Sequence, residues 1–144
     1  MRTFFFILFI ILNCILIFKV NQYFRPKTAA ITYGISLVAI PLLMLAGIYV
    51  LRLLNFHADK QFQDIYFAVM LSFTVLLLLN LVVLLADVVA HKLIDFQETT
   101  NTANMGKNPV RFARGNQSGI QLMYRFFFFA CSILMFYGIW LGKK

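Results

Sequence analysis

Four long apolar segments take up most of this chain and decide what it can fold into. They run over residues 3–20, 28–54, 66–91 and 122–141. A helix that crosses a bilayer needs about 20 mostly apolar residues, and each segment is near or above that length. The chain is also 62% hydrophobic and only 12% charged, outside the usual range of soluble domains. We therefore expect an all-α integral membrane protein, a single domain over residues 1–144 with four transmembrane helices.

The positive charge of the chain is a feature of its membrane flanks. The formal net charge is +8, and the Lys and Arg residues stand singly near the ends of the apolar segments. A nucleic-acid surface would instead gather them on one helix or patch. We expect the lipid bilayer as a partner and no nucleic acid. Cys14 and Cys131 lie inside apolar segments, where a thiol acts as a small hydrophobe, so neither a disulfide framework nor a metal site is expected.

Polar residues interrupt the third apolar segment on one side. Asn80, Asp87 and His91 are separated by seven and four residues. At about 100° per residue, these positions fall within an arc of about 40° on one helical face. Asn13 lies near the middle of the first segment, where an amide can form a hydrogen bond to another helix. We interpret these residues as a polar seam that packs against neighbouring helices, and we predict that Asn80 and Asp87 face protein rather than lipid.

The second apolar segment carries two helix-packing candidates. Pro41 stands at its centre, where a missing backbone hydrogen bond favours a kink. Gly34 follows Ala30 at a spacing of four, the small-residue pattern that lets another helix approach closely. We therefore expect a kinked helix with a low-relief face around Gly34.

The last part of the chain contains candidates for contact with lipid or a partner. Arg111 and Arg114 belong to a polar loop at about 95–121, whose first part can prolong the third helix. These arginines suit anionic headgroups or an acidic protein surface. In the fourth segment, Arg125 is expected to reach the nearby interface, and Trp140 is expected to form an aromatic anchor with Tyr137 at the far end.

The charges outside the apolar segments also predict an orientation. Four helices place both termini and the link at 55–65 on one side, with the other two links opposite. The second side receives eight of the thirteen Lys and Arg residues, and the first receives five. Because positive loops stay in the cytoplasm, we expect both termini outside, in a bacterial cytoplasmic membrane.

Asp87 is the one position in these segments where ion chemistry has to be considered. An ionisable residue inside a membrane helix is a functional hypothesis by default. One reading is a proton or ion relay in which His91, one turn away, donates to Asp87. The other is an interfacial Asp87 paired with His91, Lys92 or a residue of the first or second helix, contributing packing specificity. We favour packing, because a pump should show such groups in several helices.

Other chemistry finds little support in the residues. Haem b is not expected, since His57 lies in a link and His91 at a helix end rather than at ligating depth. No phosphate-binding glycine loop, nucleophile elbow or Cys-x-x-Cys motif occurs. We therefore expect no cofactor, no metal ligand and no catalytic residue in this chain.

Four stretches resemble the membrane region that precedes the catalytic domain in bacterial, Bacteroidetes-like membrane-bound metallophosphoesterases. They are the helix exit at residues 13–23 and the runs IPLLMLAGIY (40–49), LLADVVAHKLI (84–94) and YGIWLGKK (137–144). In that family a similar ending leads into the phosphoesterase domain, which holds the two-metal site. The resemblance implies a membrane module, and no metal ligand of the family carries over to any residue here.

These observations leave three hypotheses for function. The first is a non-catalytic structural or accessory subunit of a larger membrane complex, with other integral membrane subunits as partners. The second is an anchor module related to membrane-bound metallophosphoesterases. The third is a small transporter or proton-coupled protein that uses Asp87.

Overall fold

The computed structural model describes residues 1–21, 26–53, 59–100, 112 and 115–142. It is all-helical in this part of the chain. The elements are α1 (Arg2–Ile15), the π-helix η1 (Leu16–Val20), α3 (Pro26–Leu53), α4 (Lys60–Thr100) and α6 (Gln117–Trp140). In the described residues, four helices are long and apolar enough to cross a membrane. This confirms the all-α fold and the number of long apolar helices expected from the sequence.

The helix bounds differ most from the expected ones in α4. It begins at Lys60 and ends at Thr100, so both polar flanks of the apolar run are helical. Its 41 residues correspond to about 60 Å at 1.5 Å per residue, twice the thickness of a hydrocarbon core of about 30 Å. The polar loop expected at about 95–121 is shorter, because α4 continues to Thr100 and α6 already begins at Gln117. The length of an apolar run therefore predicts the apolar part of a helix, but it does not predict how far the helix continues into its polar ends.

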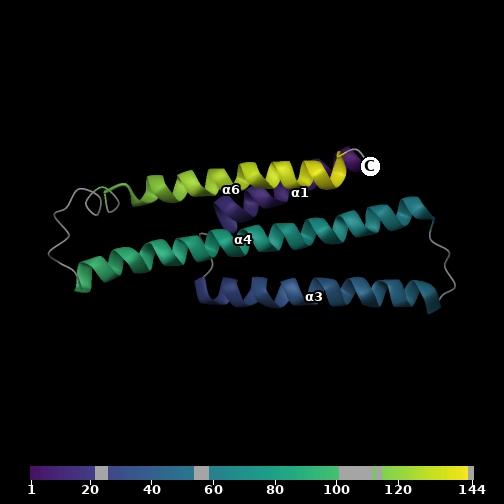
Figure 1. Ribbon diagram of the computed structural model, residues 1–144, viewed down its shortest axis with the longest axis horizontal. Coiled ribbons are helices and arrows are strands. Elements are labelled where there is room, and N and C mark those ends of the chain that lie inside the picture. Colours follow the sequence, from purple (N-terminus) through teal and green to yellow (C-terminus); the bar gives the residue numbers. More distant parts are fainter. Residues whose placement is uncertain (22–25, 54–58, 101–111, 113–114, 143–144) are drawn as a thin grey trace.

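The helices lie side by side in the order α3, α4, and then α1 with α6 (Figure 1). α4 packs against all of the other helices, whereas α3 packs mainly against α4. α1 and α4 run in one direction, and α3 and α6 run in the other (Figure 1). α4 is therefore the central helix, and α3 lies at the edge.

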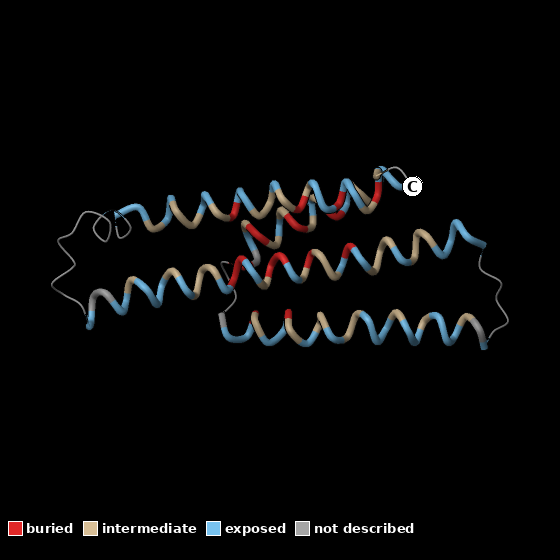
Figure 2. Tube along the Cα trace, viewed as in Figure 1, coloured by how far each residue is buried: buried red, intermediate tan, exposed pale blue. Residues whose placement is uncertain are grey.

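The main core lies where α1, α4 and α6 meet. It is built on Phe9, Leu76, Phe136 and Trp140. A second, smaller cluster joins α3 to α4 through Ala29, Tyr33 and Leu84. Figure 2 shows the buried positions of α4 in the middle of that helix, whereas those of α6 continue to its end, and the described side chains of α3 are buried at only two places near its start.

The surroundings of Pro41 and Gly34 differ from the kink and the close helix contact that the sequence predicts. α3 continues as one helix through Pro41, which is exposed, and in the view of Figure 1 this helix has no sharp bend along its length. A Cβ atom built on Gly34 would meet nothing within 4 Å. Gly34 therefore makes no close helix contact within the described chain. The close approach occurs at Gly47, where a Cβ atom would collide with the hydroxyl of Tyr66.

Candidate functional site: a polar seam along α4

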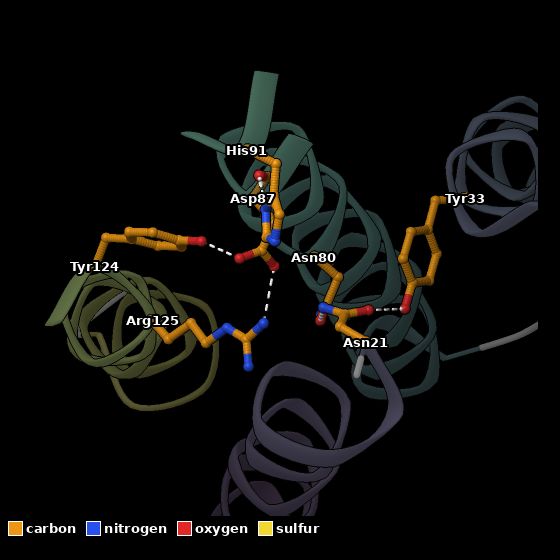
Figure 3. Close-up of polar contacts among 7 residues, drawn as sticks. All are labelled: Asn21, Tyr33, Asn80, Asp87, His91, Tyr124 and Arg125. Atoms are coloured by element: carbon orange, nitrogen blue, oxygen red, sulfur yellow. Dashed lines mark hydrogen bonds and ion pairs between the residues drawn. The ribbon is translucent and has the colours of Figure 1, made fainter. Parts of the chain in front are cut away.

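The seam expected on α4 exists and contains two separate clusters. We call the first, made of Asn13, Asn21, Tyr33 and Asn80, the amide cluster. We call the second, made of Asp87, Tyr124 and Arg125, the charged cluster. Figure 3 shows the charged cluster and, except for Asn13, the amide cluster around α4. Asn80 and Asp87 are about 10 Å apart along the helix, at 1.5 Å per residue. Both side chains face neighbouring helices, which is the orientation predicted from the sequence.

The amide cluster is a directional chain of hydrogen bonds centred on Asn80. The Tyr33 hydroxyl donates to Asn21 Oδ1 at 2.6 Å, and Asn21 Nδ2 donates to Asn80 Oδ1 at 3.1 Å. Asn80 Nδ2 then donates to Asn13 Oδ1 at 2.9 Å and to the Leu76 carbonyl at 2.8 Å. The carbonyl bond fixes the orientation of the Asn80 amide, because a carbonyl only accepts. Asn80 of α4 thus bonds to Asn13 and Asn21 of the first helix, by which we mean α1 together with η1 and Asn21. Asn21 in turn bonds to Tyr33 of α3.

The chain of donors ends inside the protein. Asn13 and Asn80 are both 0% exposed, and Asn13 Nδ2 has no hydrogen-bond partner among the described residues. A buried donor without a partner costs about 1–3 kcal/mol. The other hydrogen bonds of the amide cluster offset that free-energy cost only while the helices keep this arrangement. The cluster therefore stabilises one specific packing of the first helix on α4.

The charged cluster joins α4 to α6. Arg125 Nη2 donates to Asp87 Oδ2 at 2.9 Å, and the Tyr124 hydroxyl donates to Asp87 Oδ1 (Figure 3). The Arg125 and Asp87 side chains are 9% and 13% exposed, so the ion pair is largely buried. Within the part of the chain that the structure describes, Arg125 Nε has no hydrogen-bond partner. Removing one member of such a pair leaves an unpaired buried charge, which is much more costly than removing both.

Three sequence expectations about this cluster were wrong. Arg125 does not reach outward to an interface; it is buried and binds Asp87. The partners of Asp87 come from α6 rather than from the first or second helix or from Lys92. His91 bonds through Nδ1 to the backbone carbonyl of Asp87 at 2.8 Å, and its exposed ring does not pair with the carboxylate. Within a helix, a side chain four residues on reaches the carbonyl more readily than the diverging carboxylate.

Trp140 also lies elsewhere than expected. It is 2% exposed, its Nε1 donates to Ser72 Oγ at 2.8 Å, and its ring stacks on Phe5 with centroids 5.0 Å apart. The anchor expectation was wrong because the indole N–H finds its polar partner on α4 rather than at a lipid headgroup. Tyr137, by contrast, is exposed. Arg111 and Arg114, the loop candidates, lie outside the described residues.

Sequence reasoning missed Asn21, Ser72, Tyr33 and Tyr124. Asn21 follows directly after the apolar segment at 3–20, in the polar stretch that the sequence predicts as a link to the second segment. The pairing of Arg125 did have a signal, since charges inside a membrane helix usually pair with each other and Asp87 was the available anion. Nothing in the pattern distinguished Tyr33 from other aromatic residues.

The seam offers hydrogen bonds and an ion pair rather than an evident reaction centre. Within the described ranges, no group of three or more His, Cys, Asp or Glu side chains is placed to hold a metal ion. The polar atoms of both clusters point at one another across helix interfaces (Figure 3). Comparison with protein-family models, curated proteins and solved structures gave no match for this chain.

Proposed function

We propose that this chain is an integral membrane protein whose four long helices cross a bacterial cytoplasmic membrane. Four apolar helices of sufficient length support this proposal, as does the inward direction of the polar seam. In hydrocarbon, a polar side chain is tolerated where it bonds to a neighbouring helix, and both clusters meet that condition.

The orientation follows from the positive residues. Lys19, Lys27 and Lys92 are exposed, and they belong to η1, the first turn of α3 and the C-terminal part of α4. The end of the first helical segment, the start of α3 and the end of α4 lie toward the same end of the bundle (Figure 1). That side is the cytoplasmic one, and both chain termini lie outside. The last turns of α4, which extend past α3 in Figure 1, then project toward the cytoplasm.

Within the membrane, the protein acts as a non-catalytic structural or accessory subunit that binds another integral membrane protein. The observation that carries this proposal is the exposure of α3: among the described side chains of this helix, Ala29 and Tyr33 are the only buried ones, and both lie near its start. Most of its large apolar side chains are exposed. They include Ile31, Ile35, Val38, Leu42, Leu43, Leu45, Ile48, Tyr49 and Val50. A helix held mainly by one neighbour has most of its surface available for a partner.

Site-specific photocrosslinking in the native membrane tests the subunit proposal. A photoreactive residue replaces Leu42 on α3, which is 61% exposed, or Leu134 on α6, which is 73% exposed, as a matched control. We expect one discrete protein adduct from position 42, the same partner in mild-detergent purification, and lipid adducts alone from position 134. Lipid adducts from both positions, together with a monomer by native mass spectrometry, would contradict the proposal.

A transporter that uses Asp87 is the weaker alternative. An ion carrier has to exchange protons or ions with water, but this carboxylate already accepts bonds from Arg125 and Tyr124. Both carboxylate oxygens are thus held by residues of α6, which suits a packing role. Purified protein in liposomes should therefore conduct protons no faster than empty liposomes. A proton flux that disappears in Asp87→Asn would reverse this preference.

A further inference from the structure

The buried positions of the first helix recur at an unusual interval. Phe9, Asn13, Ile17 and Asn21 are all less than 10% exposed, and each follows the last by four residues. In an α-helix, four residues turn by about 400°, so each step drifts by about 40° around the axis. Asn21 would then point about 80° away from Asn13, eight residues earlier. A regular α-helix would not aim both amides at Asn80.

The π-helical turn η1 corrects this drift. The backbone N–H of Asn21 donates to the carbonyl oxygen of Leu16, five residues back, which is the hydrogen bond of a π-helix. A π-helix has about 4.4 residues per turn, or roughly 82° per residue, so five residues of η1 take back about 90°. Asn21 returns to within about 10° of Asn13, and both amides reach Asn80.

The corrected direction of Asn21 determines how α3 is held. Asn21 is the link in the amide cluster between the first helix and α3, since it accepts from Tyr33 and donates to Asn80. Tyr33 is, with Ala29, one of two buried residues among the described side chains of α3. We propose that η1 is a register device, a π-helical turn that aligns Asn21 with Asn13 and thereby couples the docking of α3 to the first helix. A change of η1 to α-helical geometry would turn Asn21 away and disconnect Tyr33.

Two one-residue changes in η1 separate this proposal from a general sensitivity to mutation. Deleting Lys19, which is exposed, makes Asn21 the seventh residue after Asn13, and in a regular α-helix the two amides then point only about 20° apart. Inserting one Ala after Lys19 makes Asn21 the ninth residue after Asn13, and in an α-helix the two amides then point in opposite directions. The deletion should therefore keep the amide cluster and dispense with the π-turn, whereas the insertion should break the cluster.

A double-mutant cycle with Tyr33→Phe reads out the coupling. Equilibrium unfolding by SDS in mixed micelles is measured for the full chain and for each register variant, with and without Tyr33→Phe. We expect Tyr33→Phe to lower the folded-to-unfolded ratio about threefold in the original chain and in the deletion, the typical size of an interhelical hydrogen bond. It should have no effect in the insertion. Equal loss of the Tyr33 effect in the deletion and in the insertion would overturn the proposal.

A measurement on the unchanged chain covers the case in which the deletion variant does not fold. Nuclear Overhauser contacts between the side-chain amides of Asn21 and Asn80 are recorded by NMR in micelles. They should be present in the original chain, because only the π-turn brings Asn21 to this face. Their absence from a folded chain would refute the register device.

Discussion

Asp87 of α4 and Arg125 of α6 form a largely buried ion pair with 2.9 Å between Oδ2 and Nη2. A pair of this kind adds little net stability over apolar residues of similar size, because both charges lose hydration. It does penalise every packing of α4 on α6 that separates the two charges. The pair therefore specifies which faces of the two helices meet.

The cost of breaking this pair should depend strongly on how it is broken. Arg125→Leu and Asp87→Leu should each lower the free energy of unfolding by about 3 kcal/mol, because each leaves an unpaired buried charge. The double variant should lose less than either single variant. SDS unfolding in mixed micelles measures all three, and additive losses would show that the two residues do not interact.

Asn80 should be the most sensitive position of the amide cluster. Asn80→Leu removes its bonds to Asn13 and Asn21, and at ~0.6 kcal/mol for each interhelical bond we expect a loss of about 1 kcal/mol or slightly more. Leu78→Ala is the control on the same helix, since Leu78 is half exposed. Equal losses at the two positions, measured by the same unfolding assay, would argue against the hydrogen-bond chain.

Trp140 is the single tryptophan of the chain and so reports on its own burial. Its fluorescence should resist quenching by acrylamide until the protein unfolds. Ser72→Ala removes the acceptor of the indole N–H and should cost about 1–2 kcal/mol, because the donor then stays buried without a partner. Adding Trp140→Phe to Ser72→Ala should lower the free energy of unfolding little further through hydrogen bonding, because the unpaired indole donor is then removed as well. Strong quenching of the folded chain would instead place Trp140 at an exposed surface.

The two glycines of α3 should respond in opposite ways to an added methyl group. Gly47→Ala should destabilise the contact of α3 with α4, because the new Cβ collides with the hydroxyl of Tyr66, which donates to the Met44 carbonyl at 3.3 Å. Gly34→Ala should leave the stability of the isolated chain unchanged or raise it by up to about 1 kcal/mol through helix propensity. Thermal unfolding in detergent distinguishes them. A loss at Gly34 in the isolated chain would reveal a contact that the structure does not show.

The helices themselves could be anticipated from the sequence to within a few residues for α1, α3 and α6. Apolar run length determines these elements, because in an apolar environment the backbone has to satisfy its own hydrogen bonds. The polar start of α4 escaped the same reasoning, since residues 60–65 are helical although they carry charges and polar groups that composition alone would assign to a link. The extension of α4 into the polar stretch after residue 91 was anticipated, and its end at Thr100 was not.

The polar seam shows where sequence reasoning reaches its limit. A constant turn per residue was enough to place Asn80 and Asp87 on one face of α4 and to predict that this face meets protein. It could not choose their partners, because that depends on which helix lies alongside and in which rotation. Arg125 pairs with Asp87 only because α6 packs on α4, and Asn21 joins the cluster only because η1 departs from α-helical geometry. The sequence by itself determined the apolar helices and the seam, whereas the tertiary structure decided the pairs, since hydrogen bonds and ion pairs need contact between residues far apart in the chain.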